Sequence, residues 1–240
     1  MKITLLGTGD AIGTPQIGCE CPQCTHAKST GDMRLRTSLL IENEGKHILI
    51  DSSPDLRQQL LRAGSPHIDA VIWTHGHYDH FMGFGEFYRV QKIPPVFAAT
   101  EVLNYCSDYF RFLRFDKIAI EPYVPFSLFG ITITPFMVRH PPAFTCGMRL
   151  ETEKSRIGYT SDTNINLPEK SLDLLKNLDL LLLDAIVPSR INIPKHMNYL
   201  DACSLARQLA PKDFRCVHMS HMIPWDLPHT AKDGDVFEFA

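Results

Sequence analysis

The sequence contains no run of apolar residues long enough to cross a membrane, since a spanning helix needs about 20 such residues. Residues 1–7 also contain too few apolar side chains for a secretory signal, and their pattern is more typical of a β-strand. We therefore expect a cytoplasmic protein that makes no contact with membranes.

A strong excess of charge of either sign is also missing. The chain has 24 lysines and arginines against 27 aspartates and glutamates, which gives a formal net charge of −3. Domains that bind nucleic acids usually carry a marked basic excess or a basic face. The composition therefore argues against nucleic acid as a partner.

No linker or internal repeat divides the 240 residues, of which 44% are hydrophobic. A chain of this length can bury a sizeable core. Strand-like and helix-like patterns alternate along it, so we predict one domain of the α/β (α+β) class over residues 1–240. We predict helices near residues 81–91 and over residues 101–113, with the aromatic residues of the second helix in the core.

The cysteines do not suit a framework of disulfide bonds, because there are seven of them and three crowd into one short segment. Cys19, Cys21 and Cys24 lie in a region, residues 8–36, that we expect to be a loop without regular structure. Three thiolates at this spacing are typical of a structural zinc site, which takes four ligands. His26 is close in sequence and His221 is distant, and either could complete the site.

The strongest functional signal is a cluster of metal-binding residue types directly after the apolar residues 71–73. It comprises His75, His77, Asp79 and His80. Histidine and carboxylate are the usual ligands of catalytic zinc, iron and manganese. His75 and His77 point the same way in an extended chain, whereas Asp79 and His80 follow at a turn. Four ligands are too many for one open tetrahedral site, so the segment predicts two metal ions.

Other candidate residues follow predicted strands or lie in loops. Asp51 and Asp162 end strands, where each could simply cap a helix, and Asp51 could instead orient a metal-binding histidine. His140 and His218 come after two further strands. His196 lies in a loop before a helix predicted to start near residue 200, and we single it out as a candidate catalytic residue.

The motif His75-x-His77-x-Asp79-His80, followed in order by His140, Asp162 and His218, resembles the metallo-β-lactamase superfamily. The resemblance implies a four-layer αββα sandwich. It also implies that one divalent ion is bound by His75, His77 and His140 and a second by Asp79, His80 and His218. Asp162 would bridge the two ions, which could be manganese, zinc or iron, and a metal-bound hydroxide would attack the substrate. The zinc β-lactamases commonly have cysteine where Asp162 stands, which argues against lactamase activity.

The cysteine cluster, the pair His218 and His221, and the loop around His196 are similar to the PhnP branch of the superfamily. That branch comprises phosphodiesterases of phosphonate metabolism that act on 5-phosphoribosyl 1,2-cyclic phosphate. The resemblance implies a structural zinc on the three cysteines and His221. It also implies that His196 binds a phosphate oxygen or protonates the leaving group.

The expected function is therefore hydrolysis of a small phosphodiester, either similar to 5-phosphoribosyl 1,2-cyclic phosphate or a cyclic nucleotide. Catalysis would depend on the two metal ions, with Asp79, Asp162 and His196 as the catalytic residues. Two other classes stay open: an RNA-processing nuclease of the tRNase Z type, and a non-catalytic metal-binding scaffold. The sequence shows no inserted RNA-binding arm, and a scaffold has no need of a bridging aspartate. The loop at residues 8–36 could also form a homodimer interface.

Overall fold

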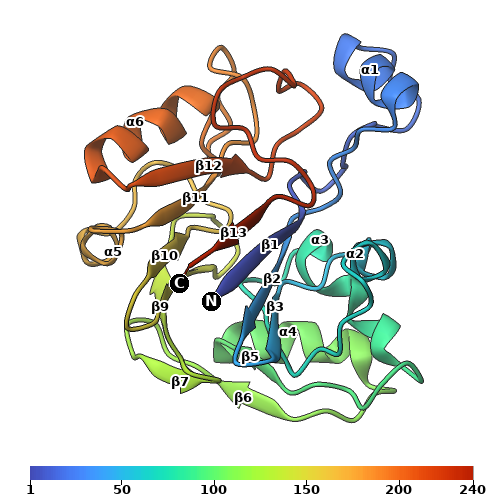
Figure 1. Cartoon of the computed structure of the whole chain (residues 1–240), viewed down its shortest axis with the longest axis vertical. Coiled ribbons are helices and arrows are strands. Elements are labelled where there is room, and N and C mark those ends of the chain that lie inside the picture. Colours follow the sequence, from blue (N-terminus) through green and yellow to red (C-terminus); the bar gives the residue numbers. More distant parts are fainter. Residues whose placement is uncertain (240) are drawn as a thin grey trace.

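The computed structural model describes residues 1–239 and contains two β-sheets that face each other (Figure 1). The first sheet has the strand order β13-β1-β2-β3-β4-β5-β6 and the second the order β12-β11-β10-β9-β8-β7. The strands of the first sheet are β1 (Lys2–Gly7), β2 (Ser38–Asn43), β3 (Lys46–Ile50), β4 (Ala70–Ile72), β5 (Val96–Ala98), β6 (Lys117–Ala119) and β13 (Val236–Glu238). Those of the second are β7 (Phe126–Leu128), β8 (Ile131–Met137), β9 (Cys146–Glu151), β10 (Arg156–Tyr159), β11 (Leu180–Asp184) and β12 (Asp213–Val217).

Helices cover the outer face of each sheet, so the molecule has four layers. On the first sheet these are α2 (Leu56–Arg62), α3 (Tyr78–Phe81) and α4 (Thr100–Ser107), and on the second they are α5 (Glu169–Leu174) and α6 (Tyr199–Leu209) (Figure 1). Each boundary between layers has its own hydrophobic cluster. The αββα sandwich that the sequence predicted is confirmed.

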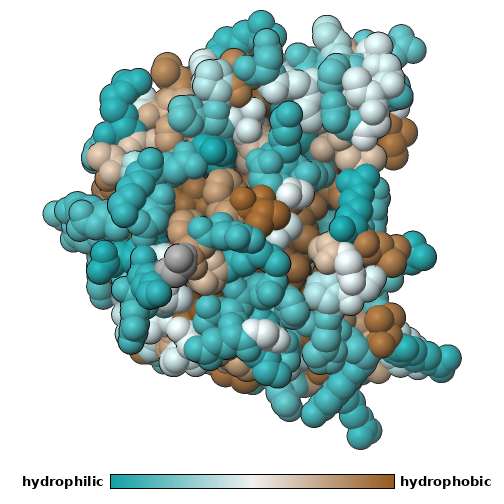
Figure 2. Space-filling model, in the orientation of Figure 1, coloured by the Kyte–Doolittle hydropathy of each residue, from teal (hydrophilic) through white to brown (hydrophobic). Residues whose placement is uncertain are grey.

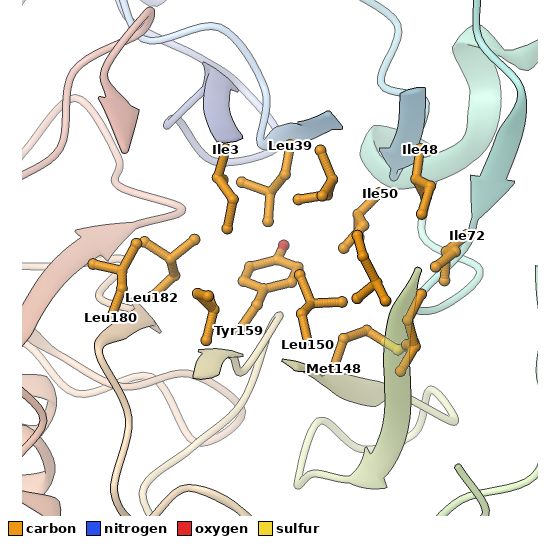
Figure 3. Close-up of a cluster of buried hydrophobic side chains, with 14 of the residues drawn as sticks. Ile3, Leu39, Ile48, Ile50, Ile72, Met148, Leu150, Tyr159, Leu180 and Leu182 are labelled. Atoms are coloured by element: carbon orange, nitrogen blue, oxygen red, sulfur yellow. The ribbon is translucent and has the colours of Figure 1, made fainter. Parts of the chain in front are cut away.

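The central strands are apolar on both faces because each face packs against another layer. In β11, Leu180 and Leu182 point into the cluster between the sheets, while Leu181 and Leu183 pack under the outer helices. The same alternation occurs along β3. Figure 3 shows the inner cluster, in which isoleucine and leucine side chains of the first sheet meet Met148, Leu150 and Tyr159 of the second.

The carboxyl ends of several strands lie at one edge of this sandwich. β3 and β4 run parallel in the first sheet, and β10, β11 and β12 run parallel in the second. β8 has the direction of β10, because each is antiparallel to β9 between them. In open α/β sheets this edge is where ligands usually bind.

Two helical predictions need correction. The segment predicted as one helix near residues 81–91 is α3 followed by a 3₁₀-helix, Met82–Phe87, and the segment 101–113 is α4 followed by a 3₁₀-helix, Asp108–Phe110. Of the aromatic residues expected in the core, only Phe110 is buried. Tyr105, Tyr109 and Phe112 are exposed, and the hydroxyls of the two tyrosines form a hydrogen bond with each other at the surface.

The region 8–36 was expected to lack regular structure, and this is wrong for its middle part. Residues 22–30 form helix α1 (Pro22–Thr30), which projects from the body of the molecule (Figure 1). Pro22 fits the first helical position, and Gly31 ends the helix with a positive φ of 81°. Only Cys24 and Ala27 of this helix are buried, so it has no apolar stripe from which it could be predicted.

Among the helices of residues 1–239, none combines the length and apolar composition that a membrane-spanning helix requires. Hydrophilic residues predominate on the face shown in Figure 2, and the hydrophobic residues there gather in small patches. The two ends of the described chain are neighbours, since the amino group of Met1 donates a hydrogen bond to the carbonyl of Phe239.

Candidate metal centre

The seven predicted metal ligands converge at the edge where the parallel strands end. They come from both sheets: four follow β4, and the other three follow β8, β10 and β12. The structure groups them into two sets of four that share Asp162. These sets are His75, His77, His140 and Asp162, and Asp79, His80, His218 and Asp162, with the donor atoms of each set within 4.8 Å of one another.

The first set has the spacing of a metal site. Nε2 of His140 lies 3.0 Å from Nδ1 of His77, and Oδ2 of Asp162 lies 3.6 Å from Nε2 of His75. Ligands bonded at about 2.0–2.1 Å to a tetrahedral ion are themselves roughly 3.3 Å apart. The donor atoms therefore enclose a volume suited to one divalent cation.

The second set is equally compact. Nε2 of His218 lies 3.3 Å from a carboxylate oxygen of Asp79 and 3.3 Å from one of Asp162. Nε2 of His80 lies 3.3 Å from Asp79 and 3.4 Å from Asp162. Asp162 presents Oδ2 to the first set and Oδ1 to His80, so one carboxylate borders both volumes.

Several of these donor atoms are buried and have no hydrogen-bond partner among residues 1–239. They include Nε2 of His75, Nε2 of His80 and Oδ1 of Asp162. An unsatisfied buried polar atom costs about 1–3 kcal/mol, so a cluster of them is unfavourable unless a ligand satisfies it. The donor set and its free lone pairs fit two divalent cations, and the roles of the seven residues as ligands stay predictions.

The pKa shifts in the first set favour the protonation states that bind cations. Burial lowers the pKa of His140 to about 4 and also lowers the pKa of His75, so both imidazoles are neutral. Burial opposes ionisation of Asp162, but His218 and His80 overcome this effect and hold its pKa well below the usual range. Neutral imidazole and ionised carboxylate are the forms that coordinate metals. Burial lowers the pKa of His80 and His218, but nearby carboxylates, above all Asp162, overcome this effect and raise both pKa values, so these two imidazoles would release a proton on binding a cation.

Hydrogen bonds to the other ring nitrogen fix the orientation of individual histidines. Nδ1 of His80 lies 2.7 Å from Oδ2 of Asp51, the residue expected to orient a metal-binding histidine. Asp51 also accepts hydrogen bonds from the backbone and hydroxyl of Thr74, just before His75. Nδ1 of His140 lies 3.0 Å from the carbonyl oxygen of Lys195.

Asp184 is a buried residue of the site that the sequence analysis did not single out. Its Oδ2 lies 2.7 Å from Nδ1 of His196, and it also accepts a hydrogen bond from the backbone of Thr163. Its Oδ1 lies 3.7 Å from Nδ1 of His218. Like Asp51 and Asp162, it stands at the end of an apolar strand, and this position was the available signal.

His196 lies directly beside the two metal-ligand sets. Its ring centroid is 4.6 Å from that of His140 and 5.2 Å from that of His218, to which it is nearly parallel. Because Nδ1 is bound to Asp184, Nε2 is the ring atom left for a substrate. The loop before α6 therefore brings the candidate catalytic histidine to the metal centre.

The backbone is strained at three of the strand ends that carry the site. Asp51, Ser161 and His218 adopt positive φ values of 60°, 53° and 56°. Non-glycine residues rarely occupy this left-handed region, at a cost of about 1–3 kcal/mol each. The sharp turns direct Asp51, Asp162 and His218 to the centre.

The residues of the predicted zinc site also lie close together. The sulfur atoms of Cys19, Cys21 and Cys24 lie 3.5, 3.4 and 3.6 Å from Nδ1 of His221. A tetrahedral zinc bonded at about 2.3 Å to sulfur and about 2.0–2.1 Å to nitrogen separates such atoms by roughly 3.5 Å. His26 instead lies 3.0 Å from a carboxylate oxygen of Asp32, so the geometry favours His221 as the fourth ligand.

A buried arginine connects this cysteine site to the metal centre. The guanidinium of Arg34 donates hydrogen bonds to the carbonyls of Ser220, Ile223 and Pro224, and it stacks on Trp225 at 4.2 Å. The segment that it binds, residues 220–224, contains His221 and begins two residues after His218. This role could not be predicted from the sequence, because it depends on contacts between residues nearly 190 positions apart.

The four-layer sandwich with this donor set at one edge is typical of the metallo-β-lactamase fold. A family model for the beta-lactamase superfamily domain matches residues 46–219. The chain therefore belongs to the metallo-β-lactamase superfamily.

Solved structures with the same fold include a protein described as a new diphosphatase from the PhnP family. It has a TM-score of 0.89 and 31% sequence identity, and the match covers 100% of this chain and 98% of that one. Zinc-bound PqqB from Methylobacterium extorquens has a TM-score of 0.85 at 21% identity, over 99% of this chain and 100% of that one. The predicted resemblance to the PhnP branch is confirmed.

A relative named octanoyltransferase, from Porphyromonas gingivalis, is 30% identical over 243 residues. The match covers 95% of this chain but only 48% of the relative. This chain therefore spans about half the length of that protein. The name of the relative refers to the whole longer molecule.

Proposed function

We propose that the protein hydrolyses a small phosphodiester, with cyclic ribose phosphates and cyclic nucleotides as the substrate class. The observation that carries this proposal is that one carboxylate, Asp162, borders two four-residue metal sets, with His196 beside them. When bound, two divalent ions activate water and neutralise the charge of a phosphoryl group. A donor set of five imidazoles and two carboxylates suits zinc, iron or manganese.

The protein's own residues supply orientation and a proton. Asp184 accepts a hydrogen bond from Nδ1 of His196, which leaves Nε2 to donate to a phosphate oxygen or to the departing alkoxide. Asp51 and Lys195 fix the rings of His80 and His140 through their outer nitrogen atoms. The ligand atoms are therefore held in place before a substrate arrives.

A second candidate is cleavage of a diphosphate bond. It is favoured by the 31% identity to the PhnP-family diphosphatase over nearly the whole of both chains. In a disubstituted diphosphate, as in a phosphodiester, the attacked phosphorus loses one oxygen substituent and keeps one ester group. The same metal centre and the same proton donor would therefore serve either one.

The test is a substrate panel with the manganese- or zinc-loaded protein. It contains 2′,3′-cyclic nucleotides, ribose 1,2-cyclic phosphate, dinucleoside diphosphates, precursor tRNA and an octanoyl thioester. We expect turnover of a small phosphodiester or diphosphate that is lost in Asp162→Asn. Turnover of the thioester alone, or of precursor tRNA alone, would overturn the proposal.

A further inference from the structure

A pocket of about 340 Å³ adjoins the metal centre and takes no part in the chemistry described above. His77 lines one side of it, and Nδ1 of the same ring lies 3.0 Å from His140 in the first metal set. Pro142 and Phe144, from the loop that follows His140, line another side. A substrate with its phosphorus at the metal centre would extend into this space, which we call the tyrosine pocket after Tyr105.

The wall formed by Tyr105 is exposed yet fixed. Its side chain is 53% exposed, and its hydroxyl lies 3.1 Å from that of Tyr109. Its ring packs so tightly on Gly76 that a Cβ atom there would come within 2.6 Å of the ring. The glycine between two predicted metal ligands thus allows an aromatic ring to lie against the metal-binding segment. A fixed, exposed aromatic face is a favourable surface for stacking another ring.

The charge of the residues that line the pocket disfavours a phosphate group there. Its one charged side chain is the carboxylate of Glu101, and no lysine or arginine of residues 1–239 lines it. A carboxylate repels phosphate and can only accept hydrogen bonds. The preferred occupant is therefore a neutral group with aromatic faces and N–H donors.

We propose that the tyrosine pocket binds the nucleobase of a nucleoside phosphodiester, stacked on Tyr105 and hydrogen-bonded to Glu101. This inference rests on the proposed function and narrows its substrate class from ribose phosphates to nucleotides. Guanine presents two adjacent N–H donors, which a carboxylate accepts as a pair. Uracil presents one donor between two carbonyl oxygens, so guanine should be preferred over uracil. The volume lies at the low end of the range for small-ligand pockets, about 300–1,000 Å³, and suits one nucleoside rather than an oligonucleotide.

The kinetic test compares guanosine 2′,3′-cyclic phosphate, uridine 2′,3′-cyclic phosphate and ribose 1,2-cyclic phosphate. Wild type should have the highest kcat/KM for the guanosine compound. In Tyr105→Leu the ratio of kcat/KM for guanosine over ribose substrate should fall about tenfold, through KM, because base stacking on an aromatic ring is lost. Glu101→Gln should lower the ratio for guanosine over uridine. Tyr88→Leu removes an exposed tyrosine that does not line the pocket, and it should leave both ratios unchanged.

A binding measurement separates this inference from the proposed function. Calorimetric titration of the metal-loaded protein with guanosine monophosphate and with ribose 5-phosphate should show tighter binding of the nucleotide in wild type but not in Tyr105→Leu. If no diester is hydrolysed but this preference holds, the proposed function fails and the pocket assignment stands. Equal binding of the two compounds, or equal losses on all substrates in Tyr105→Leu, would overturn the pocket assignment.

Discussion

Nδ1 of His196 lies 2.7 Å from Oδ2 of Asp184, and both side chains are buried. Asp184 is the last residue of β11, and His196 comes from the loop before α6. The carboxylate holds the imidazole in the orientation that presents Nε2 to the metal centre. Two roles for His196 follow from this geometry, namely donation of a proton to the leaving group and binding of a phosphate oxygen.

The two roles predict different responses to the leaving group. A proton donor matters for an alkoxide but hardly for p-nitrophenolate, which is stable without a proton. If His196 is the general acid, His196→Ala should lose about 10²–10⁴-fold in kcat on a cyclic nucleotide and much less on bis(p-nitrophenyl) phosphate. Asp184→Asn should show the same pattern in weaker form. Equal losses on both substrates would instead indicate phosphate binding, and no loss on either would exclude both roles.

Asp162→Asn should reduce both metal content and turnover, because Asp162 borders both ligand sets. Changing a residue that merely orients a ligand typically costs about 10–100-fold in affinity or activity, so we expect a loss of at least about 100-fold. Inductively coupled plasma mass spectrometry of the purified protein measures the number of metal ions bound per chain. Asp226→Asn, at an exposed position outside the ligand sets, serves as the matched control. Full metal content in Asp162→Asn would contradict the bridging role.

Cys21→Ser should remove one zinc ion per chain and loosen residues 19–31. Few apolar side chains of this segment are buried, so a metal ion would contribute much of its stability. Hydrogen exchange should rise over α1, while β11 and β12 stay protected. Cys203→Ser, at a cysteine outside the metal-ligand sets, should change neither zinc content nor exchange. Unaltered exchange over α1 after loss of zinc would show that the helix is stable without it.

Arg34→Met should lower the free energy of unfolding by about 1–3 kcal/mol or more, because it leaves buried carbonyl groups without their donor. The measurement is denaturant unfolding of the metal-loaded protein. Arg36→Met is the matched control, since Arg36 pairs with Asp55 at a partly exposed position. Equal effects of the two substitutions would show that the contacts of Arg34 to residues 220–224 contribute no more to the free energy of unfolding than the surface ion pair of Arg36 does.

Asp233 should make stability depend on pH. It accepts hydrogen bonds from Thr8 and Leu35, yet burial raises its pKa to about 6, above the usual value of 3.8. The folded protein thus binds a proton more tightly than the unfolded chain does, and this contribution to stability is lost as the pH rises from about 4 to about 6. The unfolding free energy of wild type minus that of Asp233→Asn should therefore decrease as the pH rises over this interval. A constant difference would mean that Asp233 titrates normally.

Much of the fold could be predicted from the sequence because burial on two faces leaves a simple pattern. The run from Leu180 to Leu183 is apolar throughout, and the structure buries every one of its residues. Helix α1 was missed for the opposite reason, since it buries only Cys24 and Ala27 and therefore has no apolar stripe. Tyr105 and Tyr109 were assigned to the core because helical spacing alone does not show which face meets solvent.

Part of the candidate site could likewise be predicted from the sequence and part could not. Its ligands could be predicted because histidine and aspartate at strand ends are distinctive residue types. The contacts of Asp184 could not, because the sequence does not distinguish an aspartate that caps a helix from one that binds a histidine 12 positions away. His26 and His221 were separated only by the folded chain, which brings His221 across some 200 residues to the cysteines.

The candidate metal centre is built across the boundary between the two sheets. His75, His77, Asp79 and His80 follow a strand of the first sheet, whereas His140, Asp162 and His218 follow strands of the second. Neither half alone provides a complete set of donors. Cations bound there would stabilise the folded arrangement of both sheets over the unfolded chain by mass action, so the stability of the fold would depend on the supply of metal.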